Sequence, residues 1–229
     1  MAIRVLQIIP TLVRSGAEKQ MTELAIGLPR DEFDVHVAVL THSGPYEQTL
    51  RDAEIPITMI DKKLKIDPFA YGRLKRVIKQ LKPDIVHTWI FAANSYGRKA
   101  AFAAGVEHVV AGERCVDPWK SWHEFAIDRW LAKRTERIVT NSSGVREFYS
   151  QHGIDAEKFE IIPNGIRPFE LSGRLTREAL LEQLDLPADA KLIGSVGRLW
   201  PQKRTKDLIW AAELLKAARD DTHLLLVGN

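Results

Sequence analysis

The sequence has a single cysteine, Cys115, among its 229 residues. A lone cysteine excludes a disulfide framework and any metal site built from several thiolates, and it fits a reducing compartment. No stretch approaches the roughly 20 apolar residues that a membrane-spanning helix needs. Residues 1–12 hold a short apolar run but no signal-peptide cleavage region. We therefore expect a cytoplasmic, soluble protein that is at most peripheral to the inner face of a membrane.

An excess of charge of either sign is also missing. The chain has 33 Lys and Arg against 30 Asp and Glu, which gives a net charge of +3. This balance is too small to indicate a nucleic-acid partner, although it could help to attract an anionic sugar nucleotide or a membrane surface. The sequence also lacks internal repeats, the G-x-G-x-x-G dinucleotide fingerprint and the Walker pattern.

What the sequence does contain is a regular alternation of short β-rich runs and helical periods. Strands are expected at residues 3–9, 35–40, 57–60, 85–87, 106–111, 137–140, 159–162, 192–196 and 223–227. Helices are expected at residues 17–28, 46–53, 68–81, 95–104, 118–133, 145–151 and 205–218, with a short one opened by Thr176. This order predicts an α/β fold in which helices cover both faces of a mostly parallel sheet. Ligands of such sheets bind beyond the carboxyl ends of the strands, so the loops that follow strands are the candidate site.

The composition changes over residues 166–188, where Pro168, Gly173 and Pro187 flank the short helix. We interpret this segment as an interdomain connection between a first domain of residues 1–165 and a second that starts at residue 189. Residues 189–229 form one strand–helix–strand unit, which is shorter than the roughly 50 residues of an independent domain. The second domain is therefore expected to be incomplete.

The loop after the first strand contains Ser15 and Gly16 and leads to Glu18. Ser15 and Glu18 have the spacing of a capping box, which by itself explains the start of a helix. Alternatively, Gly16 lets the backbone approach a phosphate at a positively polarised helix N-terminus. Both interpretations stay open at this point.

Other chemistry-bearing residues follow later strands. His87 ends one strand, where it is either a catalytic group or a hydrogen-bonded structural histidine. Glu113 and Arg114 end another, as site residues or as a solvated pair of charges.

Two further loops complete this set. Asn141 precedes Ser142, which suffices as a helix N-cap. Asn164 and Gly165 form a turn signal that also suits a hinge between domains. We expect Ser15, Glu113, Arg114, Asn141, Asn164 and Gly165 to shape the ligand cleft.

Arg198 and Lys203 lie in the loop after a later strand, next to Gly197. Two cations and a glycine at a strand-to-helix crossing suit a diphosphate, because a guanidinium binds it bidentately and an ammonium acts as a point charge. Exposed loops commonly hold Lys and Arg without such a role. We favour the diphosphate, since the cations flank the place where a ligand would lie.

The helix expected at residues 118–133 is rich in tryptophan, with Trp119, Trp122 and Trp130 on one face. Packing of these side chains into the core is the default expectation. A face that contacts an acceptor or a membrane is the alternative, and exposed tryptophans would favour it.

The ordered set of motifs resembles glycosyltransferase family four, retaining enzymes with two facing Rossmann-like domains, known as the GT-B fold. The resemblance spans nearly the whole chain. It is carried by Ser15–Glu18, Asp84–His87, Ile138–Ser142, Ile161–Gly165, Val196–Leu199, Lys203 and Leu224–Gly228.

This resemblance implies a sugar transfer from a nucleotide-sugar, usually UDP- or GDP-linked, with retention of the anomeric configuration. Gly16 would face the donor phosphates and the acceptor, while Arg198 and Lys203 would neutralise the leaving diphosphate. Because these cations do that work, no metal and no cofactor is expected. The acceptor would be a glycan, a lipid-linked sugar or a cell-envelope precursor.

The chain departs from the family pattern at several positions. Ser15 stands where the family usually has a first glycine, and Arg167 where it usually has an aspartate. Many members have a second histidine at the position of Trp89, and close relatives often have one at that of Ala92. His87 is thus only a partial substitute for the site histidine. The acidic motif that contacts donor sugar and ribose falls outside this sequence.

The leading hypothesis is therefore a retaining hexosyltransferase-type glycosyltransferase of cell-envelope polysaccharide biosynthesis, of which this chain alone would be inactive. A glycosyltransferase-like nucleotide-binding or interaction module without catalysis is the alternative, which Trp89 and Ala92 favour. An epimerase of the same fold would place further carboxylates and histidines in the first-domain cleft, and the sequence shows none there.

Overall fold

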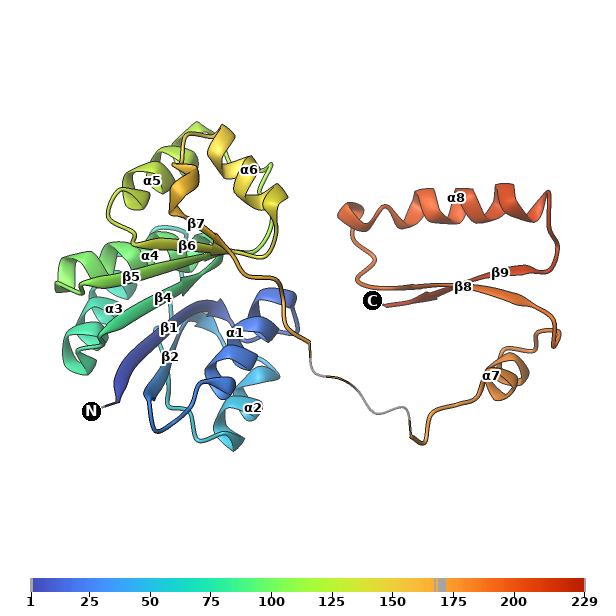
Figure 1. Cartoon of the computed structure of the whole chain (residues 1–229), viewed down its shortest axis with the longest axis horizontal. Coiled ribbons are helices and arrows are strands. Elements are labelled where there is room, and N and C mark those ends of the chain that lie inside the picture. Colours follow the sequence, from blue (N-terminus) through green and yellow to red (C-terminus); the bar gives the residue numbers. More distant parts are fainter. Residues whose placement is uncertain (1, 167, 169–171, 229) are drawn as a thin grey trace. The chain divides into compact units, whose positions relative to one another are not determined.

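The computed structural model describes residues 2–166, 168 and 172–228. The chain divides into two compact units, residues 1–166 and residues 167–229 (Figure 1). Arg167, expected to replace a family aspartate, lies outside the described residues.

The first unit is built on a seven-stranded sheet with the order β3-β2-β1-β4-β5-β6-β7. Every pair of neighbouring strands in it is parallel. The strands are β1 (Ile3–Thr11), β2 (Phe33–His42), β3 (Ile57–Met59), β4 (Ile85–Trp89), β5 (His108–Glu113), β6 (Arg137–Thr140) and β7 (Phe159–Ile161). The predicted α/β class with a parallel sheet is confirmed.

Helices connect each strand to the next. They are α1 (Gly16–Gly27), α2 (Tyr46–Asp52), α3 (Pro68–Leu81), α4 (Ile90–Ala104), α5 (Trp122–Ala132), α6 (Ser143–Gln151) and the 3-10 turn η1 (Ala156–Lys158). The Asp67 side chain caps α3 by accepting a hydrogen bond from the Ala70 amide, with Pro68 in the first turn. Gly105 ends α4 in the left-handed conformation, with φ of 84°.

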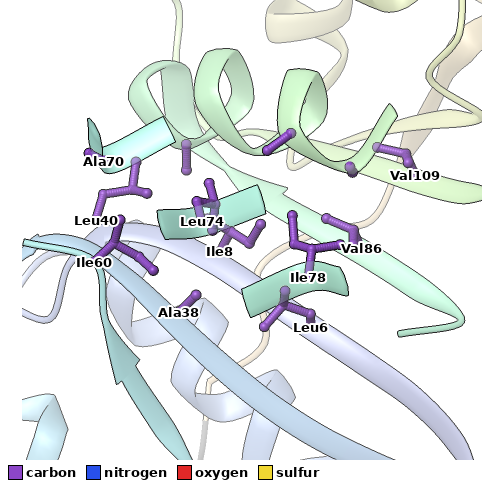
Figure 2. Close-up of a cluster of buried hydrophobic side chains, with 13 residues drawn as sticks. Leu6, Ile8, Ala38, Leu40, Ile60, Ala70, Leu74, Ile78, Val86 and Val109 are labelled. Atoms are coloured by element: carbon purple, nitrogen blue, oxygen red, sulfur yellow. The ribbon is translucent and has the colours of Figure 1, made fainter. Parts of the chain in front are cut away.

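Apolar clusters lie on both faces of the sheet. On one face, α3 and α4 pack over β1, β2 and β4, with Leu74 and Ile78 of α3 above Leu6 and Ile8 of β1 (Figure 2). A second cluster joins α1 and α2 to β1 and β2, and a third joins α5 and α6 to β5–β7. Burial of apolar side chains at roughly 1.5–3 kcal/mol each makes this packing the main source of stability.

Two expectations for α5 were wrong, its first residue and the core packing of its tryptophans. The helix begins at Trp122 rather than residue 118, and Trp119, Trp122 and Trp130 are 56–79% exposed instead of packed in the core. The buried side of α5 carries Phe125 and, together with it, the carboxylates of Glu124 and Asp128. Helix α4 also begins five residues earlier than expected, at Ile90.

The second unit contains a two-stranded parallel sheet of β8 and β9. Its elements are α7 (Arg177–Gln183), β8 (Lys191–Val196), the 3-10 turn η2 (Pro201–Lys203), α8 (Thr205–Lys216) and β9 (Thr222–Val227). The Thr176 side chain caps α7 by accepting from the Ala179 amide. Several large apolar side chains of this unit are exposed, including Trp210 at 70% and Val196 at 83%. This small unit therefore buries little of its own apolar surface.

Candidate functional site

The strand order of the first unit reverses between β1 and β4, which are neighbours although β2 and β3 follow β1 on its other side. At such a switch point, the connections leave adjacent strands in opposite directions and open a crevice at the carboxyl edge of the sheet. The loops after β1, β4, β5, β6 and β7 all reach this edge, because all the strands are parallel. The candidate site of the first unit is therefore this edge.

The first loop at the edge presents backbone rather than side chains. Ser15 is the N-cap residue of α1 and has an extended backbone, but its side chain makes no capping bond. Glu18 is instead buried and accepts a hydrogen bond of 2.7 Å from the Thr11 hydroxyl at the end of β1. The predicted capping box is thus wrong, because Thr11 binds the carboxylate that would have closed it.

Gly16, the first residue of α1, is exposed, and a Cβ placed on it would meet no atom within 4 Å. Nothing in the first unit therefore requires a glycine here. A helix N-terminus that lacks a side-chain cap and carries a bare glycine is suited to the close approach of an anion.

Gly44, in the loop after β2, packs against the backbone of the first loop. A Cβ on Gly44 would lie 2.4 Å from the carbonyl oxygen of Leu12 and 2.7 Å from the amide of Val13. The Tyr46 amide donates to the same Leu12 carbonyl at 3.1 Å. Sequence reasoning missed this contact, because a Ser-Gly-Pro turn gives no hint of which loop it meets.

These two glycines make a matched pair of variants. Gly44→Ala is expected to lower the free energy of unfolding by about 1–3 kcal/mol, since the new methyl group must displace the backbone of the first loop. Gly16→Ala is expected to change it by less than about 0.5 kcal/mol, since the methyl group enters open space. Urea denaturation of both variants checks this. Equal losses would contradict the arrangement of the first loop.

Trp89, at the end of β4, organises the centre of the edge. Its indole Nε1 donates to the buried Gln7 side chain of β1 at 2.7 Å. The Arg114 guanidinium lies 5.2 Å from the centre of the Trp89 ring and donates to Asn164 Oδ1 at 2.5 Å. The last residue of β4 is thereby joined to residues that follow β5 and β7. A polar residue within an apolar strand, Gln7, was the signal that could have revealed part of this arrangement.

Gly165 is fixed to α1 by two hydrogen bonds. The Gln20 amide nitrogen donates to the Gly165 carbonyl at 2.7 Å, and the Gly165 amide donates to Gln20 Oε1 at 3.0 Å. The turn after β7 is thus held against the helix that starts at Gly16. Sequence reasoning identified Gly165 but not Gln20, which lies 145 positions away.

His87 lies beneath this layer rather than on it. The residue is 8% exposed, and its ring centre lies 4.6 Å from that of Trp89. Burial, assisted by the positive charge of Arg114, lowers the pKa of His87 to about 3. The imidazole is therefore neutral at physiological pH. Among the described residues, its Nε2 atom has no hydrogen-bond partner.

Glu113, the last residue of β5, belongs to a buried ionic cluster. One carboxylate oxygen accepts from the Asn94 amide at 2.8 Å, and the other accepts from the Tyr149 hydroxyl at 3.1 Å. Burial raises the pKa of Glu113 to about 7, although the charge of Lys120 opposes this rise. Glu113 thus faces the interior, not the open edge.

The centre of the cluster is Asp128 of α5. Its two oxygens accept from Arg98 and from Lys120, each at 2.9 Å. Lys120 also lies 3.2 Å from Asp117, and its ammonium donates to the Tyr149 hydroxyl at 2.8 Å. This cluster ties the loop after β5 to α4, α5 and α6. Sequence reasoning missed it, because nothing in the local pattern distinguishes an inward charge from an outward one.

Asn141, after β6, is half-buried, and Ser142 caps α6 by accepting from the Val145 amide. Asn141 Oδ1 has no hydrogen-bond partner among the described residues, nor has Oγ1 of the neighbouring Thr140 or Oε2 of Glu18. Three buried polar oxygens without partners therefore lie near the ends of β1 and β6. Such groups are rare in native proteins, and each one calls for an explanation such as a bound water, an ion or a functional role.

Ile90, the first residue of α4, has φ of 55°. A β-branched residue in the left-handed region is strained, since its Cβ crowds the backbone there. The strain lies directly after Trp89, at the switch point.

In the second unit, the loop between β8 and η2 holds the predicted cations. The Arg198 guanidinium lies 4.5 Å from the centre of the Trp200 ring. Lys203 ends η2 and is exposed, while the neighbouring Arg204 pairs with Asp207. A Cβ on Gly228, at the end of β9, would lie 1.8 Å from the Gly197 carbonyl oxygen. Glycine is thus required where the two strand ends meet.

No group of three or more His, Cys, Asp or Glu side chains in the described part of the chain is arranged to hold a metal ion. Among the same residues, no helix has both the length and the apolar character to cross a membrane.

A family model described as Glycosyltransferase Family 4 matches residues 14–168, which is more than half of the chain. The chain belongs to Glycosyltransferase Family 4. This match confirms the resemblance found in the sequence and covers the whole edge from the first loop to Gly165.

Two curated proteins are similar to this family member along most of its length. The UDP-Gal:alpha-D-GlcNAc-diphosphoundecaprenol alpha-1,3-galactosyltransferase of Escherichia coli is 29% identical over 210 residues, covering 86% of this chain and 53% of the relative. The alpha-maltose-1-phosphate synthase of Mycolicibacterium smegmatis is 25% identical over 228 residues, covering 89% of this chain and 54% of the synthase. The chain thus spans about half the length of the curated relatives that it matches.

Solved structures show the same fold. Anabaena HepE in complex with UDP has a TM-score of 0.79 and 20% identity, covering 98% of this chain and 60% of HepE. A glycosyltransferase from Rickettsia africae has a TM-score of 0.73 and 22% identity, and the match covers 100% of this chain and 61% of that protein. A UDP-N-acetylglucosamine 2-epimerase from Listeria monocytogenes also matches, with a TM-score of 0.60 and 16% identity. This match covers 99% of this chain and 62% of the epimerase. The predicted GT-B type fold, present in part, is confirmed.

The first unit of this family four chain brings several predicted site residues to one edge. Ser15, Gly16, Arg114, Asn164 and Gly165 lie there, joined through Trp89 and Gln20. His87 and Glu113 lie below the edge. Arg198 and Lys203 belong to the second unit, and the roles of all these residues stay predictions.

Proposed function

We propose that this chain is part of a retaining glycosyltransferase that transfers a hexose from a UDP-sugar to a lipid-linked glycan of the cell envelope. The observation that carries the proposal is the family match over residues 14–168, which includes every predicted site residue of the first unit. The E. coli relative is named for UDP-galactose and a diphosphoundecaprenol-linked acceptor, and HepE binds UDP. These names support the donor base and the acceptor class.

In this proposal the protein stabilises the leaving diphosphate with its own cations. Charge develops on the diphosphate as the bond to the sugar breaks, and preorganised donors lower the barrier by stabilising that charge. Arg198 and Lys203 are proposed to supply this stabilisation. The exposed start of α1 at Gly16 is proposed to approach the phosphates. Neither a metal nor a cofactor is required, so EDTA should leave turnover unchanged.

The test is a donor panel with the full-length protein. UDP-galactose, UDP-glucose, UDP-N-acetylglucosamine and GDP-mannose are each incubated with a polyprenyl-diphosphate-linked sugar, and the released nucleotide and the product anomer are measured. UDP release that depends on the acceptor, with an α-linked product from an α-linked donor, is expected. Transfer from GDP-mannose alone, or an inverted product, would contradict the proposal.

The polypeptide of residues 1–229 gives a second prediction. It is expected to bind UDP weakly and to transfer no sugar, because the matched relatives are about twice as long. Calorimetry with UDP and the transfer assay above, run beside the full-length protein, measure this. Sugar transfer by residues 1–229 alone would show the prediction to be wrong.

A non-catalytic nucleotide-binding module is the second candidate function. The burial of His87 favours it, since a neutral imidazole that is 8% exposed is poorly placed to touch a substrate. The two functions differ in one result: a module binds UDP-sugar in the full-length protein without ever releasing UDP, whereas a transferase releases it when the acceptor is added.

A further inference from the structure

The loop between β5 and α5, residues 114–121, follows the carboxyl end of β5 and is anchored below the edge of the sheet (Figure 1). At the edge, the Arg114 guanidinium lies against the Trp89 ring. Below the edge, Asp117 and Lys120 of the same loop enter the buried ionic cluster. We call it the β5 cluster, and its members are Arg98, Glu113, Asp117, Lys120, Asp128 and Tyr149. The order of this part of the candidate site therefore depends on the charges in the β5 cluster.

The Tyr149 hydroxyl joins the charged groups of the cluster. It lies 2.8 Å from the Lys120 ammonium, 2.8 Å from Asp117 Oδ2 and 3.1 Å from Glu113 Oε2. A hydroxyl has one hydrogen and two lone pairs, whereas an ammonium can only donate. Lys120 thus occupies one lone pair, and the hydroxyl hydrogen serves either Asp117 or Glu113. The second lone pair is filled when the other carboxyl group donates a hydrogen of its own.

The surroundings of the two carboxyl groups place this hydrogen on Glu113. Asp117 Oδ2 lies 3.2 Å from the Lys120 ammonium, and Asp117 Oδ1 accepts from the Trp119 indole at 3.1 Å, which favours a carboxylate. Glu113 Oε1 lies 4.0 Å from the same ammonium, beyond hydrogen-bond distance. Burial also raises the pKa of Glu113 to about 7.

The charges of the β5 cluster balance when Glu113 is neutral. The carboxylates of Asp117 and Asp128 then face the cations Arg98 and Lys120, and Asp128 accepts from each cation at 2.9 Å. An ionised Glu113 adds a buried charge without a counter-ion, which is unfavourable. The titratable and charged groups that face Glu113 come from the loop, α4, α5 and α6, and they are Cys115, Asp117, Lys120, Arg98, Asp128 and Tyr149.

Asp117 is the carboxylate of the cluster that can move when Glu113 ionises. Its side chain is 11% exposed, against 5% for Glu113 and 1% for Asp128. Glu113 belongs to a strand and Asp128 to a helix, whereas Asp117 belongs to the loop. Outward movement of Asp117 therefore relieves the repulsion between the two carboxylates most easily. Trp119, which donates to Asp117 and whose ring lies 5.4 Å from that of Phe91, would move with it.

We propose that Glu113 carries a proton in the folded protein and that loss of this proton releases residues 114–121 from the β5 cluster. The protonated carboxyl donates a hydrogen bond to the Tyr149 oxygen, and the Tyr149 hydrogen then serves Asp117. When the carboxyl ionises, its proton passes to solvent and the loop opens at the candidate site. The inference goes beyond the proposed sugar transfer, because it concerns the order of a loop and needs neither donor nor acceptor.

Infrared spectra of the full-length protein test where the proton lies. A band of a protonated carboxyl group is expected at about pH 6 and should be lost at about pH 8.5, because the pKa of Glu113 is about 7. Glu113→Gln should lack this band at both pH values. The glutamine side chain can accept from Asn94 and donate to Tyr149 as the protonated carboxyl does, so the cluster is preserved.

Hydrogen exchange of the same proteins, without nucleotide-sugar, tests the release of the loop. The closed loop holds a proton that an opened loop loses at lower pH, so the stability of the closed loop falls as the pH rises to about 7. Between the same two pH values, protection of the amides of residues 114–121 should fall about tenfold more in the unaltered protein than in Glu113→Gln. Comparison at equal pH cancels the intrinsic pH dependence of exchange.

Glu124→Gln is the matched control, since Glu124 is also a buried glutamate and caps the helix that follows the loop. Hydrogen bonds from Ser121, first from its side chain, hold the pKa of Glu124 well below the usual range, so this carboxyl is ionised at both pH values. The control should keep the infrared band and the pH-dependent protection of the unaltered protein.

Three results would overturn the proposal. They are the absence of the band at the lower pH, a band that persists in Glu113→Gln, and equal changes of protection in the unaltered protein and Glu113→Gln. If Glu113→Gln does not fold, loss of the band from the unaltered protein between the two pH values still decides. Since no donor or acceptor is present, failure here is distinguishable from failure of the proposed transfer reaction.

Discussion

Replacement of Arg198 by alanine in the full-length protein is expected to lower kcat by about 10²- to 10³-fold, the effect of removing one preorganised donor from a developing anion. The guanidinium is exposed in the loop after β8, where it lies 4.5 Å from the centre of the Trp200 ring. Few interactions within the protein therefore depend on it. The loss should fall on the rate of sugar transfer rather than on stability.

Steady-state kinetics with a UDP-sugar and the lipid-linked acceptor measure this effect, and urea denaturation checks the fold. Lys206→Ala is the control, since Lys206 is an exposed cation in the first turn of α8, close in sequence to the same loop. Lys206→Ala should leave kcat within about twofold, because a surface side chain without such a role changes little. An Arg198→Ala protein with unchanged kcat would exclude the diphosphate role.

Asp128→Asn is expected to lower the free energy of unfolding by about 3–5 kcal/mol, because it leaves the buried Arg98 guanidinium without its counter-charge and removes one of those around the buried Lys120 ammonium. Asp128 is 1% exposed and accepts from both Arg98 and Lys120 at 2.9 Å. The substitution preserves the size of the side chain, so the loss reflects charge and hydrogen bonding rather than a cavity.

Urea denaturation of Asp128→Asn measures the loss. The control is Asp34→Asn, which breaks an ion pair with Arg4 of nearly the same length, 3.0 Å, whose side chains are 41% and 42% exposed. Since solvent screens such a pair, the control should lose less than about 1 kcal/mol. Similar losses in the two variants would show that burial does not set the strength of the Asp128 contacts.

Most of the elements of this fold could be predicted from the sequence, because their signals are local. Asp67 and Pro68 start α3 as predicted, since a capping carboxylate and a proline act within one turn. The strands of the first unit follow buried apolar runs, and parallel pairing follows from their alternation with helices.

The orientation of α5 could not be predicted in this way. Its tryptophans recur at a spacing that suits a core face, and core packing was expected for them. Glu124 and Asp128 are instead buried, because Ser121 and the cations Arg98 and Lys120 satisfy their charges. Partners such as Arg98, 30 residues away, are set by tertiary structure and leave no trace in local periodicity.

In the candidate site, too, local features could be predicted from the sequence and contacts between distant residues could not. The loops that follow strands were identified because parallel strands end at one edge. The contacts that fix those loops to each other join distant residues, as Gln20 does with Gly165 and Arg114 with Asn164. Trp89, which from the sequence was only a departure from the family pattern, proves to be the residue around which this edge is organised.

The left-handed backbone at Ile90 places steric strain next to the candidate site. Isoleucine is among the residues least tolerant of that conformation, and glycine would adopt it without a steric penalty. Substitution of Ile90 by glycine would relieve this strain at the junction where β4 meets α4, against the greater entropy that a glycine loses on folding. Glycine at position 90 would therefore show whether the backbone strain beside the switch point contributes to the proposed sugar transfer or only lowers stability.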